Sequence, residues 1–314
     1  MSFKYKKKSL ILFLILILFL FSLTFFIRKY RENFEQSKKG LLVLYGESFR
    51  DGRQNDRTRD TENSINTQEK ASKSHVTLCD YLKNTHNVNM DIVITTHDTK
   101  YKKELQNFYS KYNPNITTVD ETKDNLDAVS RITKNIQNVL LSKDIDAYDF
   151  ILLTRNDICF KPNFEPIIDP EWNKIMFVSK LIANCKYYGF FQNGDPNVNP
   201  TIIYIPKSYF AKIKNNIFID HDAWTKYKKA LNITDSDMDF MTNYSFDSDT
   251  YKDKNDYYYM VGREENTIKH NTDPIDRNLI GKTPAEIEKI ISKEEKQKCD
   301  DFKFDWKNEP HVKN

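Results

Sequence analysis

The chain has 314 residues, and 39% hydrophobic residues with 13% aromatic residues can supply the core of one large or two ordinary domains. Its 48 Lys and Arg nearly balance 45 Asp and Glu, so a net charge of +3 gives no electrostatic basis for nucleic-acid binding. Cys79, Cys159, Cys185 and Cys299 stand far apart, without the short spacings of zinc sites. They are compatible with one or two disulfides or with buried free thiols.

The N-terminus is typical of a membrane anchor. Residues 1–8 form a basic tail, and residues 9–27 are 19 positions without a charge, close to the ~20 that cross a bilayer as a helix. The apolar stretch of a signal peptide is shorter, and no small-residue cleavage site follows this one. We therefore expect an uncleaved signal anchor with the N-terminus inside, followed by a short stem at residues 28–40.

Three Asn-X-Ser/Thr triplets begin at Asn115, Asn232 and Asn243. Such triplets accept N-linked glycans in secretory compartments. Together with the anchor they predict a single-pass type II membrane protein with a lumenal or extracytoplasmic body.

From Gly40 onward, apolar runs that predict buried strands alternate with amphipathic segments that predict helices. The expected strands are 41–46, 90–98, 115–120, 150–157, 175–179 and 201–206, and the expected helices are 70–85, 100–112, 126–140 and 283–298. The last helix starts with Thr283 as N-cap and Glu286 completing a capping box. This alternation predicts one α/β domain with a mostly parallel sheet at residues 41–282, then a C-terminal helix and tail at 283–314.

Common nucleotide and hydrolase motifs are missing from the sequence. No GxGxxG follows the first strand, and neither GxxxxGK[ST] nor GxSxG occurs. Dinucleotide-binding, P-loop and α/β-hydrolase functions therefore lose their main sequence support.

The stretch Phe150–Asp157 reads FILLTRND, an apolar strand that ends in Arg155-Asn156-Asp157. Alternation along a strand places Arg155 and Asp157 on one side and Asn156 on the other. Ligands of open α/β sheets bind beyond the carboxyl ends of the strands. An arginine and a carboxylate there suit a diphosphate and a hard divalent ion; the alternative is a solvated salt bridge that caps the strand.

A strand that follows a long helix and ends in a short acidic motif resembles the nucleotide-sugar glycosyltransferases of the GT-A fold, including uncharacterised ones of microbes and large DNA viruses. The resemblance covers about residues 41–206 and implies a Rossmann-like, mostly parallel sheet flanked by helices. The family signature Asp-x-Asp binds manganese and the donor diphosphate; here Arg155 replaces its first acid and Asp157 keeps the second. The resemblance implies a nucleoside-diphosphate-sugar donor, a glycan or glycoprotein acceptor, and Mn²⁺ or Mg²⁺ on Asp157. Asp157→Ala is then expected to abolish turnover and leave the fold intact.

The same resemblance assigns donor contacts to the segments after the first two strands. In the first, Glu47 or Ser48 is expected at the base or ribose, and Arg50, Arg53, Arg57 and Arg59 at the donor phosphates. After the second strand, His97 and Asp98 are expected near the nucleoside, with Asp98 as the hydrogen-bonding group. The alternatives are an exposed mobile loop after the first strand and a helix N-cap at Asp98.

Later segments supply the expected acceptor side. Trp224 is predicted to stack on a sugar, with Asp222 or Glu264 as the base that takes the proton of the acceptor. His270, late in the chain, is predicted as a further metal ligand. The predicted location of the protein is a Golgi-like, ER-like or host membrane. An ordinary helix start is the alternative for Asp222.

Two other functions compete with the transferase. One is a non-catalytic, membrane-anchored glycan-binding ectodomain of the same fold. The other is a sulfotransferase-like enzyme, for which the segment after the first strand offers Gly46, Ser48 and Arg50 but no lysine.

Overall fold

The computed structural model describes residues 17–24, 37–51, 58–119, 127–181, 185, 187–220, 222–243, 245–246, 256–261 and 276–301. The chain divides into two units, Met1–Lys38 and Lys39–Asn314. In the first unit, residues 17–24 form a helix. Over the residues described, no helix is both long and apolar enough for a membrane crossing. The predicted tail, and most of the predicted anchor and stem, lie outside the described ranges.

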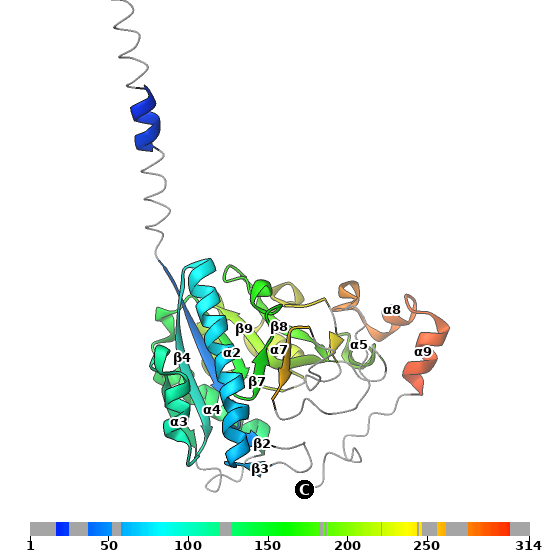
Figure 1. Cartoon of the computed structure of the whole chain (residues 1–314). Coiled ribbons are helices and arrows are strands. Elements are labelled where there is room, and N and C mark those ends of the chain that lie inside the picture. The colour runs from blue at the N-terminus through cyan, green and yellow to red at the C-terminus, as the bar shows by residue number, and fades with distance from the viewer. Residues whose placement is uncertain are drawn as a thin grey trace, which may run out of the picture. The chain divides into compact units, whose positions relative to one another are not determined.

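The second unit is built on one mixed, mostly parallel sheet (Figure 1). Seven strands follow the order β10-β8-β9-β6-β1-β4-β5, and β11 pairs with β8. β1 is parallel to β6, β4 to β5, and β10 and β11 to β8, whereas β9 is antiparallel to β6 and β8. The sheet strands are β1 (Lys38–Tyr45), β4 (Val88–His97), β5 (Asn115–Val119), β6 (Phe150–Arg155), β8 (Ile175–Leu181), β9 (Val198–Pro206), β10 (Met238–Phe240) and β11 (Ser245–Phe246).

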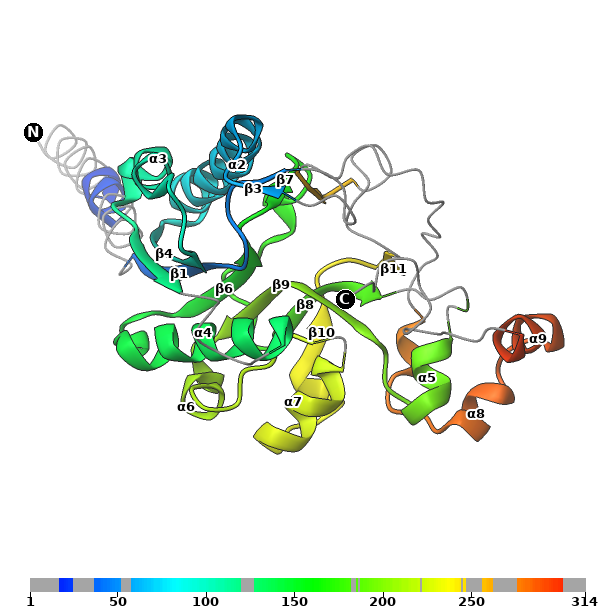
Figure 2. The ribbon, with the colours of Figure 1, turned by 90° about the horizontal axis from the view of Figure 1, so that it is seen from below.

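Helices cover both faces of this sheet (Figure 2). α2 (Glu62–His86) and α3 (Lys102–Phe108) lie on one face, and α4 (Ala128–Ser142), α6 (Phe210–Ile213) and α7 (Ala223–Leu231) lie on the other. α2 connects β1 to β4, and α4 connects β5 to β6, so the two crossovers lie on opposite faces. The strand order therefore reverses between β1 and β6, which is where open α/β sheets bind ligands.

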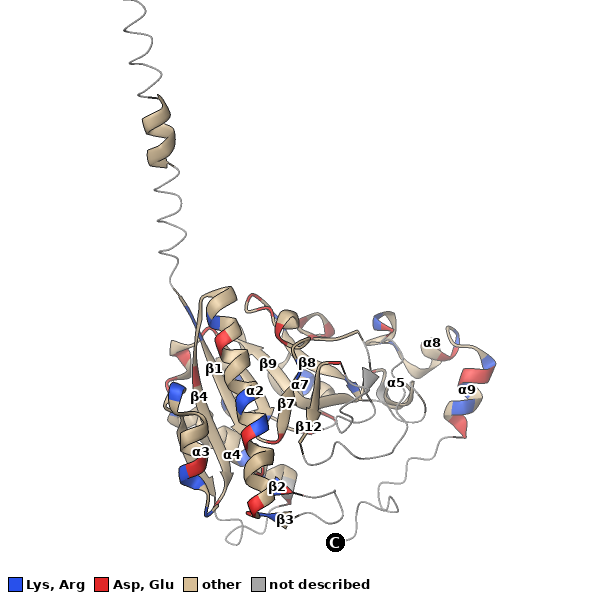
Figure 3. Ribbon diagram, viewed as in Figure 1, with Lys and Arg blue, Asp and Glu red and all other residues tan. Residues whose placement is uncertain are grey.

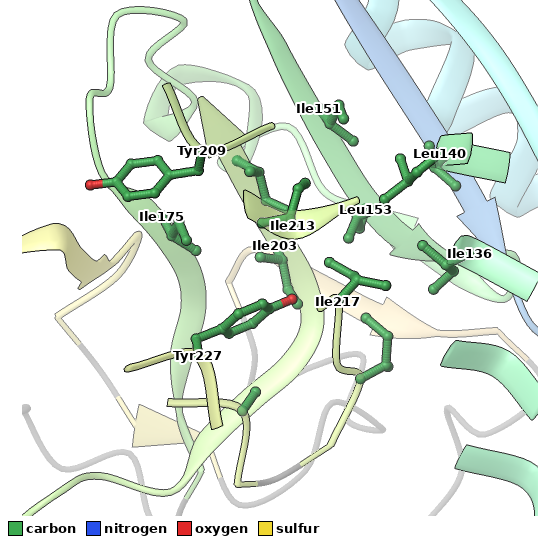
Figure 4. Close-up of a cluster of buried hydrophobic side chains, with 14 of the residues drawn as sticks. Ile136, Leu140, Ile151, Leu153, Ile175, Ile203, Tyr209, Ile213, Ile217 and Tyr227 are labelled. Atoms are coloured by element: carbon green, nitrogen blue, oxygen red, sulfur yellow. The ribbon is translucent and has the colours of Figure 1, made fainter. Parts of the chain in front are cut away.

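The strands at this reversal are apolar at almost every position because both of their faces are covered. Ile151 and Leu153 of β6 belong to the core under α4, whereas Phe150 and Leu152 belong to the core under α2. Figure 4 shows Ile151 and Leu153 facing Leu140 and Ile136 of α4. Burial on both faces makes β6 a rigid base for the polar residues that follow it.

Smaller elements complete the second unit. β2 (Arg50–Asp51) pairs with β3 (Thr58–Arg59), and β7 (Ile158–Phe160) pairs with β12 (Tyr258–Met260). A separate small core joins α5 (Tyr188–Asn193) to α8 (Pro284–Glu288) and α9 (Lys293–Asp300). A disulfide between Cys185 and Cys299 links the two sides of this core, while Cys79 and Cys159 are buried free thiols.

Two predicted helices differ from those observed. α2 begins at Glu62, before the predicted start at residue 70, because Thr61 caps it by accepting a hydrogen bond from the Ser64 amide. The predicted helix 283–298 is two helices. Thr283 and Glu286 form the expected capping box, but Ser292 begins a second one and restarts the helix.

Candidate functional site

The site begins with a tight junction between the ends of β1 and β6. Tyr45 and Arg155 are register partners. The Asn156 amide donates to the Tyr45 carbonyl at 2.8 Å, and Asn156 Nδ2 donates to the Gly46 carbonyl at 2.8 Å and the Thr95 carbonyl at 3.3 Å. Gly46 has a φ of +88°, a left-handed conformation that glycine adopts without strain. The chain therefore turns sharply there and carries Glu47 across the strand ends.

A cavity of about 300 Å³ opens at this junction. It is lined by the ends of β1, β4, β5 and β6 and by the N-terminal half of α4, through Tyr45, Gly46, Glu47, Thr95, Thr96, His97, Val119, Val129, Arg131, Ile132, Asn135 and Arg155. Its volume is at the lower end of the range for small-molecule pockets, about 300–1,000 Å³. The cavity lies at the reversal of strand order, as expected for a ligand site in this type of sheet.

The lining combines an apolar wall with groups that recognise polar ligands. Val119, Val129 and Ile132 supply apolar surface. Arg131 and Arg155 bring two guanidiniums, and Glu47 and His97 bring a carboxylate and an imidazole. This mixture suits a ligand with a flat or apolar part and an anionic part.

Arg155 and Asp157 are bonded to each other, but not through strand alternation, because β6 ends at Arg155 and Asp157 lies in the turn that follows. Arg155 Nε donates to Asp157 Oδ1 at 2.8 Å, and Arg155 Nη2 donates to Oδ2 at 2.7 Å. Arg155 lines the cavity with its side chain 28% exposed, whereas the side chain of Asp157 is only 3% exposed. Asn156 turns to the opposite side, into the junction. Arg155 is thus the member of the pair that a ligand can reach.

A second arginine holds Asp157 from within the protein. Arg50 Nη1 donates to Asp157 Oδ2 at 2.9 Å, and the side chain of Arg50 is 1% exposed. Arg50 Nε lies 3.9 Å from a Glu47 oxygen, and Arg59 Nη1 lies 3.7 Å from the other. Charges of alternating sign therefore run from Arg59 through Glu47, Arg50 and Asp157 to Arg155.

These contacts change the predicted role of Asp157. Both of its carboxylate oxygens accept hydrogen bonds from guanidiniums, and the side chain is buried. The prediction that Asp157 holds a divalent cation does not fit this geometry, because two guanidiniums already compensate the charge of a side chain that is only 3% exposed, and they would repel the ion. Over the described ranges, no group of three or more His, Cys, Asp or Glu is arranged to hold a metal.

The segment after β1 is fixed rather than a mobile loop as far as Asp51. The Ser48 amide donates to Thr96 Oγ1 at 3.0 Å, and the two hydroxyls lie 2.8 Å apart. The Phe49 amide donates to Gln68 Oε1 of α2 at 2.9 Å. Ser48 and Arg50 are buried and do not line the cavity. Their predicted contacts with donor groups are wrong: they hold the segment that presents Glu47.

The predicted acceptor residues are not at this cavity. Trp224 is fully buried, stacks on Phe240 and donates its indole N–H to Asp235 Oδ1 at 2.9 Å. The predicted sugar platform is therefore wrong, because Trp224 belongs to the core under α7. Asp222 is exposed at the start of α7 and does not line the cavity, in keeping with the alternative of an ordinary helix start.

After β4, His97 lines the cavity and Asp98 does not. Asp98 is exposed, and its backbone amide donates to the Val119 carbonyl at 3.2 Å. Of the two residues expected near the nucleoside, His97 therefore lines the cavity and Asp98 does not. Arg53, Arg57, Glu264 and His270 lie outside the described ranges, so their predicted roles stay predictions.

Sequence reasoning missed several residues of the lining. Thr95 and Thr96 end an apolar strand and look like ordinary β-formers. Arg131, Ile132 and Asn135 share one face of α4 at helical spacing, so an arginine beside the apolar stripe was the available signal. The apolar stripe, which continues to Leu140, indicates a core-facing helix, and this pattern does not distinguish a cavity-lining arginine from a solvent-exposed one.

Comparison with known proteins finds distant similarity to solved structures. No protein-family model matches this chain, and no curated protein matches it. Its structural neighbours include GT-A glycosyltransferases and nucleotide-sugar enzymes.

Three neighbours illustrate the level of similarity. A mutant of Drosophila β1,4-galactosyltransferase 7, solved with manganese, UDP-Gal and xylobiose, is 12% identical, with 79% of this chain and 81% of that chain covered and a TM-score of 0.38. An active-site mutant of LgtC is 10% identical, with 64% and 72% covered and a TM-score of 0.35. TarS of S. aureus is 12% identical, with 71% of this chain and 36% of TarS covered and a TM-score of 0.38. At these scores the neighbours carry no argument about ligands or chemistry.

Proposed function

We propose that this chain is a glycosyltransferase that binds a nucleoside-diphosphate sugar in the cavity at the ends of β1, β4 and β6. One observation carries the proposal: the cavity lies where the strand order reverses and presents two guanidiniums beside a carboxylate, an imidazole and an apolar wall. A nucleoside diphosphate has the matching parts, a flat base, a hydroxylated ribose and a doubly charged linker.

Each part of the donor has a matching group in the lining. Arg131 and Arg155 suit the diphosphate, because guanidiniums bind phosphoryl oxygens bidentately. Glu47 and His97 suit the ribose hydroxyls and base edge, and Val119 and Ile132 suit the base faces.

In the proposed reaction, an oxygen of the acceptor hydroxyl bonds to the anomeric carbon of the sugar. The bond from that carbon to the diphosphate oxygen breaks, and its electron pair leaves on the diphosphate. The acceptor proton passes to a carboxylate, for which Glu264 remains the predicted residue. Arg155 and Arg131 accelerate the step because they stabilise negative charge as it develops on the leaving diphosphate.

We further propose a glycan or glycoprotein acceptor and a lumenal or extracytoplasmic location on a single-pass anchor. The apolar stretch 9–27 supports the anchor. The Cys185–Cys299 disulfide supports an oxidising compartment, because such bonds are rare in the cytosol.

The test is thermal stability of the full-length protein in detergent with a panel of nucleoside diphosphates, followed by assays with the corresponding nucleotide sugars. We expect one uridine or guanosine diphosphate to raise the unfolding temperature and its sugar conjugate to be consumed. No response to any nucleotide supports the glycan-binding ectodomain, and a response only to adenosine 3′,5′-bisphosphate supports the sulfotransferase-like enzyme.

A further inference from the structure

At the end of β6, Arg155 lines the cavity, and the neighbouring carboxylate of Asp157 is already bonded to guanidiniums. Asp157 Oδ1 accepts from Arg155, and Asp157 Oδ2 accepts from both Arg155 and Arg50. A divalent ion on these oxygens would lie beside two guanidiniums in a buried environment, where the repulsion between like charges is strong.

The arrangement fixes the orientation of Arg155. Its two bonds to Asp157 form a planar, bidentate contact, and Arg50 holds the same carboxylate from the buried side. Asn156 ties the intervening residue to the Gly46 and Thr95 carbonyls. Arg155 therefore reaches the cavity from a backbone and a side-chain partner that are both immobilised, so little conformational entropy is lost when it binds an anion.

The local charge also favours an anion. The alternating series of Arg59, Glu47, Arg50, Asp157 and Arg155 contains three cations and two anions, and Arg131 adds a further cation to the lining. Among these six charged groups, the cations outnumber the anions by two.

We infer that the diphosphate of the donor is bound by a metal-independent guanidinium site, formed by Arg155 with Arg131, in which Asp157 is a positioning residue. This inference rests on the proposed function, and it states that guanidinium groups supply the positive charge that binds the diphosphate at the same site. It replaces the metal role that the resemblance assigns to Asp157.

The experiment measures the dissociation constants of uridine and guanosine diphosphate for the full-length protein by calorimetry, in EDTA and in manganese. We expect the nucleotide that binds to do so with similar affinity in both buffers. Arg155→Gln removes the charge and is expected to weaken binding in EDTA about 10- to 100-fold, because hydrogen bonds to charged groups are worth that much. Lys103→Gln, at an exposed cation on α3 away from the lining, is the matched control and is expected to leave the affinity unchanged.

A second variant tests whether the planar contact between Arg155 and Asp157 matters for binding. Arg155→Lys keeps the charge but cannot make the planar contact with Asp157, and is expected to give an affinity between those of wild type and Arg155→Gln. Arg155 is partly exposed, so these variants test the site without emptying a buried position.

The outcomes separate the two proposals. Binding that requires manganese and disappears in EDTA overturns the metal-independent site but leaves the glycosyltransferase in place, and so does full affinity of Arg155→Gln in EDTA. Absence of binding by any nucleoside diphosphate in either buffer overturns both proposals.

Discussion

At the scale of single residues, the partners of Asp157 decide its chemistry. In the sequence, Arg155-Asn156-Asp157 is compatible with a metal site or a salt bridge. In the fold, Arg50 arrives from 107 positions away and completes a buried cluster with two cations around one carboxylate. A buried charge in such a cluster is stabilised mainly by its partners.

This cluster predicts that Asp157→Ala unfolds more easily, contrary to the expectation of an intact fold. Removing the carboxylate leaves the buried Arg50 guanidinium without this partner, and breaking a buried ion pair in this way costs about 3–5 kcal/mol. Urea unfolding of the two variants measures the effect, with Arg155→Gln expected to lose far less because Arg155 is partly exposed. Equal losses in the two variants would mean that Arg50 does not depend on Asp157.

The burial of His75 in α2 predicts that the free energy of unfolding depends on pH. It is fully buried, and its Nδ1 lies 2.7 Å from the Tyr109 hydroxyl. Burial lowers the pKa of His75 from 6.5 to about 3, although its interactions with the Ile158 backbone and Asp157 oppose the shift. The unfolded chain therefore takes up the His75 proton first as the pH falls.

The sign follows from that order of protonation. The contribution of neutral His75 is present above pH 6.5 and is lost progressively as the pH falls toward the folded-state pKa of about 3. We expect a loss of about 2 kcal/mol in unfolding free energy between pH 7 and pH 5 from this residue. Urea titrations of wild type and His75→Gln at several pH values measure it. The same change of unfolding free energy with pH in both proteins would contradict the assignment.

At the scale of elements, capping residues in the sequence indicated where a helix starts, whereas helix lengths were not predicted correctly. The capping box at Thr283 was predicted and is present. The break before α9 arises because Ser292 and Glu295 form a second box, and the early start of α2 because Thr61 caps it. Local hydrogen bonds set these ends, whereas hydrophobic periodicity indicates only the buried middle of a helix.

The Cys185–Cys299 disulfide joins α9 to the segment before α5, with a sequence separation of 114 residues between the cysteines. A cross-link over so long a loop restricts the unfolded chain, and its loss typically costs about 2–5 kcal/mol. We expect dithiothreitol to lower the unfolding temperature of the wild type and to leave the Cys185→Ser/Cys299→Ser variant unchanged. A wild type insensitive to reductant would indicate that the bond is absent or makes no contribution.

At the scale of the whole molecule, positive and negative side chains are mixed along the helices, as the low net charge of the chain leads one to expect. Figure 3 shows Lys and Arg interspersed with Asp and Glu along α2, α3 and α9. The cations that matter for the proposed function are the few at the cavity, because the overall charge gives no steering toward an anionic partner.

The proposed lumenal location predicts glycosylation. Asn115, Asn232 and Asn243 all lie at exposed positions, so the oligosaccharyl transfer machinery can reach them. After expression in a eukaryotic secretory host, we expect a mobility shift on treatment with N-glycanase, absent from a variant with all three changed to Gln. An unmodified wild-type chain would argue against lumenal exposure of the body.

The sequence by itself determined the class of the fold and the edge of the sheet where the site lies. Apolar strands alternating with amphipathic helices admit few arrangements other than an α/β sheet, and polar residues at the end of an apolar strand indicate the edge where ligands bind. Only the tertiary structure decided which of the pair a ligand can reach, that Arg50 is an internal partner, and that Trp224 belongs to the core. Those facts depend on contacts between residues far apart in the chain, such as Arg50 with Asp157, and local pattern carries no information about them.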